Sequence, residues 1–202
     1  MGFSKTLIRR VLVVVVLVEF GLGLQHILYR PVQNQWMPPT ASTAAVRTQE
    51  KVSYGLPVRL TIPKINVDAA VDYVGVTPQG ELGVPKGPTN AAWYELGPRP
   101  GDKGSAVIDG HFGYKNNIPA VFDKLNILQK GDNIYVLDEN GKSAIFVVRE
   151  LRTYGQSEDS SGIFVSSDGK AHLNLITCQG TWSEAQKSYS NRLVVFADKE
   201  MK

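Results

Sequence analysis

Apolar and polar residues alternate along the chain from Leu56 onward, and this period of two predicts short β-strands. The alternation runs through residues 58–62 and resumes, after Pro63, through residues 65–69. Glycines lie between the apolar runs, where turns are expected. Only Pro119–Leu128 has a helical pattern, so the sequence predicts an all-β domain. Further strand candidates are Ser105–Asp109, Asn133–Leu137, Ser143–Thr153, Ala171–Cys178 and Leu193–Ala197.

The number and spacing of these strands narrow the architecture. Many short strands with turns at regular intervals are typical of an antiparallel barrel or a sandwich. A closed barrel is favoured because none of the candidate strands carries the charges that would protect an exposed edge. We therefore expect a closed β-barrel over residues 56–202.

The N-terminal region has a different pattern, a nearly continuous apolar run. Residues 11–18 are all apolar, and apolar character resumes after Glu19 as far as Leu28. A run of about 20 residues is long enough to cross a bilayer as a helix. Glu19 costs on the order of 2.5–3.5 kcal/mol at mid-bilayer, which the apolar turns around it can outweigh. We expect a transmembrane anchor over residues 11–30.

Positive charges orient this anchor. Lys5, Arg9 and Arg10 precede the apolar run, so residues 1–10 are expected to be a cytoplasmic tail. The domain would then lie outside the cell, tethered to the cell membrane by a single span. Residues 31–55, between the anchor and the domain, are rich in Pro, Gln, Thr, Ser and Ala, which indicates a flexible stalk.

A cleavable signal peptide is the alternative interpretation of the same run. Its small-residue cleavage site should lie directly after the apolar segment. The nearest candidate, residues 40–45, lies well beyond Leu28 and past three prolines, so the uncleaved anchor is favoured.

Composition excludes several classes of function. The chain has 202 residues, of which 43% are hydrophobic and 20% charged, with a net charge of +3. The basic residues are scattered, so there is no nucleic-acid footprint. No metal-ligand spacing, phosphate loop or dinucleotide fingerprint is present, and we expect no cofactor and no metal. Glu158 and Asp159 could bind calcium in principle, but a solvated loop is the simpler interpretation.

Cys178 is the only cysteine. On an exported domain it has no disulfide partner in its own chain, which makes it a candidate reactive thiol. A thiol near its reference pKa of about 8.5 is only a few per cent thiolate at neutral pH. Activation therefore requires a nearby base or cation.

Three histidines could supply the base. His26 lies in the anchor, away from the domain. His172 shares a strand and a face with Cys178, but six residues at about 3.3 Å each separate the two by ~20 Å. His111 remains, after the apolar strand 105–109 and between Gly110 and Gly113, which allow the backbone to turn sharply.

Arg192 is the candidate cation. If the strands ending at Cys178 and beginning near Leu193 pair antiparallel, Arg192 lies beside Cys178. A guanidinium there could stabilise a thiolate or an oxyanion. The chain order His, Cys, Arg differs from papain-like peptidases, in which cysteine comes first. Chymotrypsin-like cysteine peptidases typically have Gly-x-Cys-Gly-Gly, which Thr177-Cys178-Gln179-Gly180 does not match.

These residues together resemble the sortases, the cell-surface cysteine transpeptidases of Gram-positive bacteria. Residues 175–178 resemble the family signature Thr-Leu-x-Thr-Cys, with Asn174 in place of the first threonine. Gly110-His111 and the arginine-led segment 192–195 also match. Weaker matches are residues 60–65 and 92–94, and the resemblance covers about residues 57–199.

The resemblance implies an eight-stranded β-barrel and a transpeptidase mechanism. Cys178 would attack a sorting motif of the Leu-Pro-x-Thr-Gly type and form a thioester, and His111 would serve as acid and base. Arg192 would hold the substrate and steady the oxyanion, while Thr177 would act behind the site or contact the substrate. The implied partners are surface proteins with a C-terminal sorting motif and an amine acceptor of a peptidoglycan precursor or a pilin.

Subclass and two other functions stay open. The N-terminal anchor and the Trp93-Tyr94 segment lean toward sortase class E or F, and no Asp-Pro-aromatic lid motif is present. A surface cysteine endopeptidase would share the same residues but would not respond to added amines. A catalytically silent tethered barrel would not react at Cys178.

Overall fold

The computed structural model describes residues 53–201. The predicted cytoplasmic tail, the anchor and nearly all of the stalk lie outside these residues. Within residues 53–201, no helix is long and apolar enough to cross a membrane.

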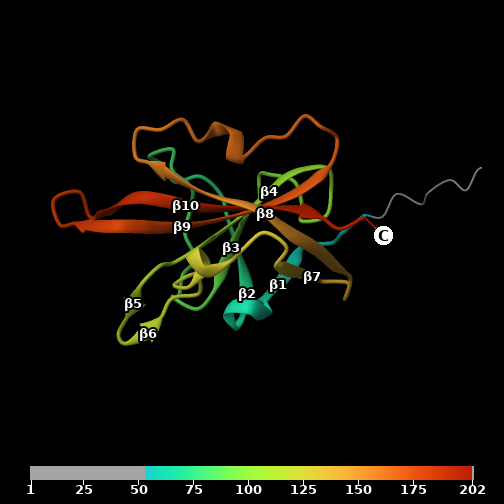
Figure 1. Cartoon of the computed structure of the whole chain (residues 1–202), viewed down its shortest axis with the longest axis horizontal. Helices are drawn as coiled ribbons and strands as arrows, with labels where there is room; N and C mark the ends of the chain where they lie inside the picture. Colours follow the sequence, from blue (N-terminus) through green and yellow to red (C-terminus); the bar gives the residue numbers. More distant parts are fainter. Residues whose placement is uncertain (1–52, 202) are drawn as a thin grey trace, which may run out of the picture. The chain divides into compact units, whose positions relative to one another are not determined.

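Ten β-strands and three short 3₁₀ helices make up the described chain (Figure 1). The strands are β1 (Pro57–Ile62), β2 (Val67–Val74), β3 (Ala91–Tyr94), β4 (Gly104–Gly110), β5 (Tyr114–Lys115), β6 (Ile118–Pro119), β7 (Asn133–Asp138), β8 (Ser143–Gly155), β9 (Ala171–Ser183) and β10 (Ser188–Lys199). The 3₁₀ helices are η1 (Pro63–Ile65), η2 (Leu125–Ile127) and η3 (Ser161–Ile163).

Eight of the strands close into a barrel, in the order β1-β2-β3-β4-β9-β10-β8-β7, with β7 paired to β1. The predicted closed all-β barrel is therefore confirmed. The expectation of a purely antiparallel sheet was wrong, because β2 pairs with β3, and β4 with β9, in parallel. Parallel neighbours need long crossover connections. The β4–β9 crossover includes β5 to β8, and alternation within single strands does not reveal it.

Alternating side chains fill the barrel interior. Leu60, Ile108, Phe146 and Leu175 are fully buried there, each on a different strand. Their neighbours in sequence point outward, as the period of two requires. The interior is thus a packed apolar core, and the polar chemistry of the chain belongs to the outside of the barrel.

A second apolar cluster covers part of the outer surface. Val107 of β4, Ile176 of β9 and Val194 of β10 are buried on that face under Ile163 and the half-buried Phe164. Both covering residues belong to the connection between β8 and β9, which includes η3. The β8–β9 connection therefore covers part of the outer face of β4, β9 and β10. The candidate site lies on the same face.

Two local expectations differ from the structure. The predicted helix at Pro119–Leu128 is mostly turns, and only η2 within it is helical. Its apolar spacing serves instead to bury Phe122, Leu125 and Leu128 against the barrel core. The hairpin formed by β9 and β10 is also longer than predicted, and Figure 1 shows it projecting past the rest of the barrel.

Candidate functional site

Strand register brings the three candidate residues to one end of the outer face. On the parallel pair β4 and β9, Asp109 is opposite Ile176. His111 and Cys178 each come two residues later, so both lie at the same end of this strand pair, just beyond the paired segment. Cys178 is directly opposite Arg192 on the antiparallel pair β9 and β10, as expected. The order across the face is His111, Cys178, Arg192.

Thr177 joins the ends of β4 and β9 from the other side of the sheet. It has the opposite parity from Cys178 and is 1% exposed. Its Oγ1 donates a hydrogen bond to the Gly110 carbonyl at 2.7 Å. This bond connects the residue just before His111 to the residue just before Cys178. The position suits a residue that acts behind the site, and contact with substrate stays a prediction.

Gly110 permits the close packing that directs His111. A Cβ at this position would lie 2.3 Å from the Phe122 ring, too close for any other residue. The backbone beyond it is fixed by the Phe122 N–H, which donates to the His111 carbonyl at 3.0 Å. The loop that carries His111 is therefore anchored on both sides of the residue.

The hydrogen bond of the His111 ring determines its tautomer. Nε2 lies 3.0 Å from the Pro85 carbonyl oxygen. A carbonyl only accepts, so Nε2 carries the proton and Nδ1 is left as the base of the neutral ring. The same nitrogen, once protonated, can return its proton as an acid. One position of His111 can therefore serve both halves of an acyl transfer.

Cys178 is half-buried, and its environment favours the thiol. Burial raises the pKa of Cys178, Arg192 partly offsets this, and the carboxylate of Asp109 adds to the increase. At neutral pH the free protein therefore holds a protonated nucleophile. Its proton has to pass to a base such as His111 when a substrate binds.

Arg192 is held by groups of its own hairpin. Nη1 donates to the carbonyls of Tyr189 at 3.2 Å and Asn191 at 3.1 Å, and Nη2 to Ser188 Oγ at 3.4 Å. Within residues 53–201 no carboxylate forms an ion pair with it. The guanidinium charge is therefore available to a thiolate or to a developing oxyanion beside Cys178.

Asp109 is a site residue that the sequence reasoning did not identify. It lies on the outer face of β4, opposite Ala92 of β3 and Ile176 of β9. Burial raises the pKa of Asp109 to about 7, although Arg192 and the Gly110 backbone N–H oppose the increase. The available signal was an acidic residue ending an apolar strand directly before Gly110-His111.

Aromatic side chains flank the site where the hairpin projects. The ring of Tyr189 makes edge contacts with Phe112, at 5.4 Å between centroids, and with Trp182, at 5.2 Å. These contacts connect the residue after His111 to the hairpin that carries Cys178 and Arg192. They stabilise the loop and the hairpin relative to each other.

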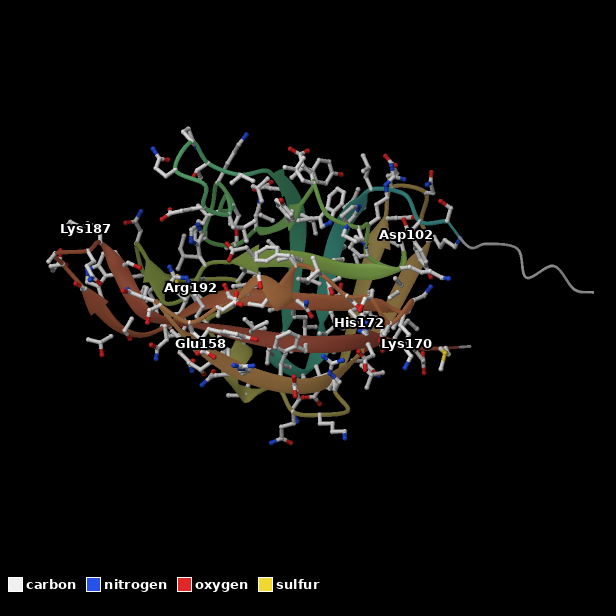
Figure 2. All side chains as sticks on the ribbon, turned by 90° about the horizontal axis from the view of Figure 1, so that it is seen from above. Asp102, Glu158, Lys170, His172, Lys187 and Arg192 are labelled. Atoms are coloured by element: carbon white, nitrogen blue, oxygen red, sulfur yellow. The ribbon has the colours of Figure 1, made fainter. Side chains whose placement is uncertain are left out.

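The other histidine of the described chain and the acidic loop have different partners. His172 is bonded to Asp198 through Nδ1, at 2.7 Å, and to Asp168 through Nε2, at 3.0 Å. Figure 2 shows it toward the opposite end of the barrel from Arg192, in agreement with its exclusion as a base. Glu158 forms an ion pair with Arg152, and Asp159 Oδ1 accepts from the Ser161 N–H at 2.9 Å.

No metal site emerges from the described residues. Within residues 53–201 there is no group of three or more His, Cys, Asp or Glu side chains placed to hold an ion. The chemistry that the arrangement supports is nucleophilic attack by a thiol, with a histidine for proton transfer and an arginine for charge stabilisation.

Comparison with solved structures shows a shared fold. Sortase C-1 of Actinomyces oris superposes with a TM-score of 0.54 at 24% identity, covering 71% of this chain and 73% of that one. A lid mutant of sortase A of Corynebacterium diphtheriae gives 0.57 at 20% identity, covering 75% and 74%. The sortase D5 transpeptidase of Clostridium perfringens gives 0.53 at 22% identity, covering 75% and 84%. No curated protein matches the sequence.

The family model of the sortase domain matches residues 60–200. That span includes the whole barrel from β1 to β10 apart from the first residues of β1, together with Cys178 and its neighbours. The chain belongs to the sortase family and is a cysteine transpeptidase.

Proposed function

We propose that this sortase is anchored in the cell membrane and joins surface proteins to an amine of the cell wall. Its donor substrate carries a C-terminal motif of the Leu-Pro-x-Thr-Gly type. The observation that supports this best is the convergence of His111, Cys178 and Arg192 on one end of the outer face. The anchor at residues 11–30 and the stalk at 31–55 would keep the barrel outside the cell, close to such an amine.

The first half of the reaction forms a thioester. His111 takes the Cys178 proton at Nδ1, and the sulfur attacks a carbonyl carbon of the sorting motif. Arg192 stabilises the negative oxygen that develops, from the strand directly beside the nucleophile. The imidazolium then protonates the departing amine, and the carbon–nitrogen bond breaks.

The second half transfers the acyl group. An acceptor amine attacks the thioester carbonyl and gives a proton to neutral His111, and the Cys178 sulfur leaves. A sulfur leaving group suits transfer, because an amine displaces a thiol readily. Hydrolysis by water is the competing outcome, and the same residues would then make the protein an endopeptidase.

We also propose a sortase class for this chain. The Trp93-Tyr94 segment and the N-terminal apolar run favour class E or F. The three solved structures compared above are sortases of classes A, C and D. Because they are at most 24% identical to this chain, they show its fold but not its class. Partners of this chain are therefore proposed from its own residues as sorting-motif proteins and a peptidoglycan or pilin amine.

The decisive experiment uses the full chain with a quenched Leu-Pro-x-Thr-Gly peptide, with and without triglycine. We expect a triglycine-linked product, identified by mass, that is lost in Cys178→Ala. Because the same thioester feeds hydrolysis and transfer, triglycine should lower the hydrolysed product as it raises the linked one.

Two results would contradict the proposal. Cleavage that triglycine does not redirect would favour the endopeptidase. Absence of any Cys178-dependent product from a randomised peptide library, together with no reaction of Cys178 with a peptide electrophile, would favour the silent barrel.

A further inference from the structure

Asp109 is an acidic group without a cationic partner beside the proposed nucleophile. Aspartates are rarely removed from water unless they are paired. This one is half-buried, and no side chain of residues 53–201 donates a hydrogen bond to it. Arg192 acts on it only across space, because the guanidinium donates instead to Ser188, Tyr189 and Asn191.

Register places this carboxylate within the proposed site. Asp109 is two residues before His111 on the same face, about 6.6 Å along the strand. Its charge raises the pKa of Cys178. Cys178 lies on the neighbouring strand β9 and is the next outward-facing residue after Ile176, the direct partner of Asp109. The neighbouring strands add no other charge next to it, since Ala92 and Ile176 are its direct partners. Of the charged groups, Arg192 acts on the pKa of Asp109, and Asp109 in turn acts on that of Cys178.

For the first half of the reaction an ionised Asp109 is a disadvantage. It raises the pKa of the Cys178 thiol and opposes the effect of Arg192. A group that impairs the nucleophile and also bears a cost of burial needs another role. The second half provides one, because the acceptor enters as an ammonium ion at neutral pH, when amino groups have pKa values of about 8 to 10.

We infer that Asp109 binds the ammonium group of the acceptor substrate and takes its first proton. The inference rests on the proposed function, since it concerns the second substrate of that reaction. The acceptor would then be a primary amine that binds in its protonated, ammonium form. A neutral nucleophile gains nothing from this carboxylate.

The proton balance is complete with the groups present. The ammonium gives one proton to the Asp109 carboxylate, and the resulting amine forms the new carbon–nitrogen bond. The carbon–sulfur bond breaks, and Cys178 leaves as a thiolate beside Arg192. The second nitrogen proton passes to His111 Nδ1, and the carboxyl of Asp109 later releases its proton to water. A carboxyl pKa of about 7 makes both proton steps accessible near neutral pH.

The test measures how one thioester partitions between transfer and hydrolysis. The full chain and its Asp109→Asn variant receive the same quenched peptide with subsaturating triglycine or hydroxylamine. Triglycine is largely an ammonium ion near pH 7, whereas hydroxylamine is largely neutral. We expect Asp109→Asn to lower the ratio of transfer to hydrolysis about tenfold for triglycine, and to leave it nearly unchanged for hydroxylamine. Because both products come from one thioester, slower or faster acylation does not affect the ratio.

Asp102→Asn is the matched control, since Asp102 is also half-buried and lies far from Arg192 in Figure 2. It should leave both ratios as in the parent. If Asp109→Asn leaves the triglycine ratio unchanged, or lowers both ratios equally, the inference is wrong.

If Asp109→Asn fails to fold, the saturation of transfer by triglycine in the parent protein decides. The triglycine concentration at half-saturation should rise as pH falls below 7 and Asp109 is protonated. A half-saturation concentration that does not depend on pH would overturn the inference. Absence of any thioester in the parent would instead contradict the proposed function.

Discussion

At the scale of single residues, the site is a set of mutually opposed charges. Arg192 favours the thiolate of Cys178, while burial and Asp109 favour the thiol, and the thiol prevails. The free protein is thus protected from adventitious reaction at its only cysteine. Attack by Cys178 therefore requires transfer of its proton to a base, the role proposed for His111.

This balance predicts the pH dependence of alkylation. Only the thiolate reacts, so the rate with iodoacetamide should rise with pH and reach its midpoint above about 8.5, the reference pKa of a cysteine. Asp109→Asn should shift the midpoint down, because it removes a negative charge, and Arg192→Ala should shift it up. A midpoint well below that reference in the parent would contradict the described electrostatics.

Loss of Arg192 should also slow catalysis. Removal of one donor to an oxyanion typically costs about 10²–10³ in turnover. We expect Arg192→Ala to lower kcat in the peptide assay by about that amount, and KM to rise as well if Arg192 also holds the substrate. Arg149→Ala is the control, because Arg149 lies on the same face of the barrel, in an ion pair with Asp198. An equal loss in both variants would indicate damage to the fold.

At the scale of elements, the parallel pairing of β4 with β9 places the proposed base, His111, at the same end of the sheet as the proposed nucleophile, Cys178. Neither residue is positioned by its own strand alone, since each comes after the segment in which the strands pair. Thr177 extends the connection by one hydrogen bond, and the Gly110–Phe122 contact fixes the loop. The geometry of the site therefore depends on a junction between two elements far apart in sequence.

Thr177→Val tests this junction. The substitution keeps the shape but leaves the Gly110 carbonyl without its donor, so we expect a loss of about 1–3 kcal/mol in the free energy of unfolding. Transfer activity should fall further than stability at the assay temperature explains, because His111 and Cys178 lose a shared support. Thr181→Val, at an exposed position of β9, should change neither. Unimpaired activity in folded Thr177→Val would exclude the positioning role.

At the scale of the whole molecule, one closed sheet provides both the stability and the face that carries the site. Closure removes exposed strand edges and encloses a single interior core. The outer cluster under the β8–β9 connection is smaller and covers only one side. Changes inside the barrel should thus affect the whole fold, while changes in the outer cluster should remain local.

Chemical denaturation distinguishes these two layers. Phe146→Ala empties a fully buried interior position and should cost about 3–5 kcal/mol, with one cooperative transition retained. Phe164→Ala, in the half-buried covering segment, should cost clearly less. Urea midpoints of the two variants and the parent measure the difference. A larger effect at Phe164 would show that the outer layer stabilises the barrel.

Features that depend on local pattern could be predicted from the amino-acid sequence alone. Alternation within strands predicted the all-β class, and the absence of a protected edge predicted closure. Distance along one strand excluded His172, and the antiparallel hairpin placed Arg192 opposite Cys178, because both arise from counting residues along one or two neighbouring strands. The resemblance in residues 175–178 and 110–111 then led to the sortase family, to which the chain belongs.

Contacts between distant segments set the remaining features, and these emerged only in the folded chain. The crossover that sets β4 beside β9 is not encoded in the period of either strand, and it brings Asp109 into the site. Burial of that carboxylate arises from neighbouring strands, so composition could not reveal its raised pKa. Packing likewise turned the helical pattern at Pro119–Leu128 into turns around Phe122, because burial against the barrel outweighs the weak helix preference of so short a segment.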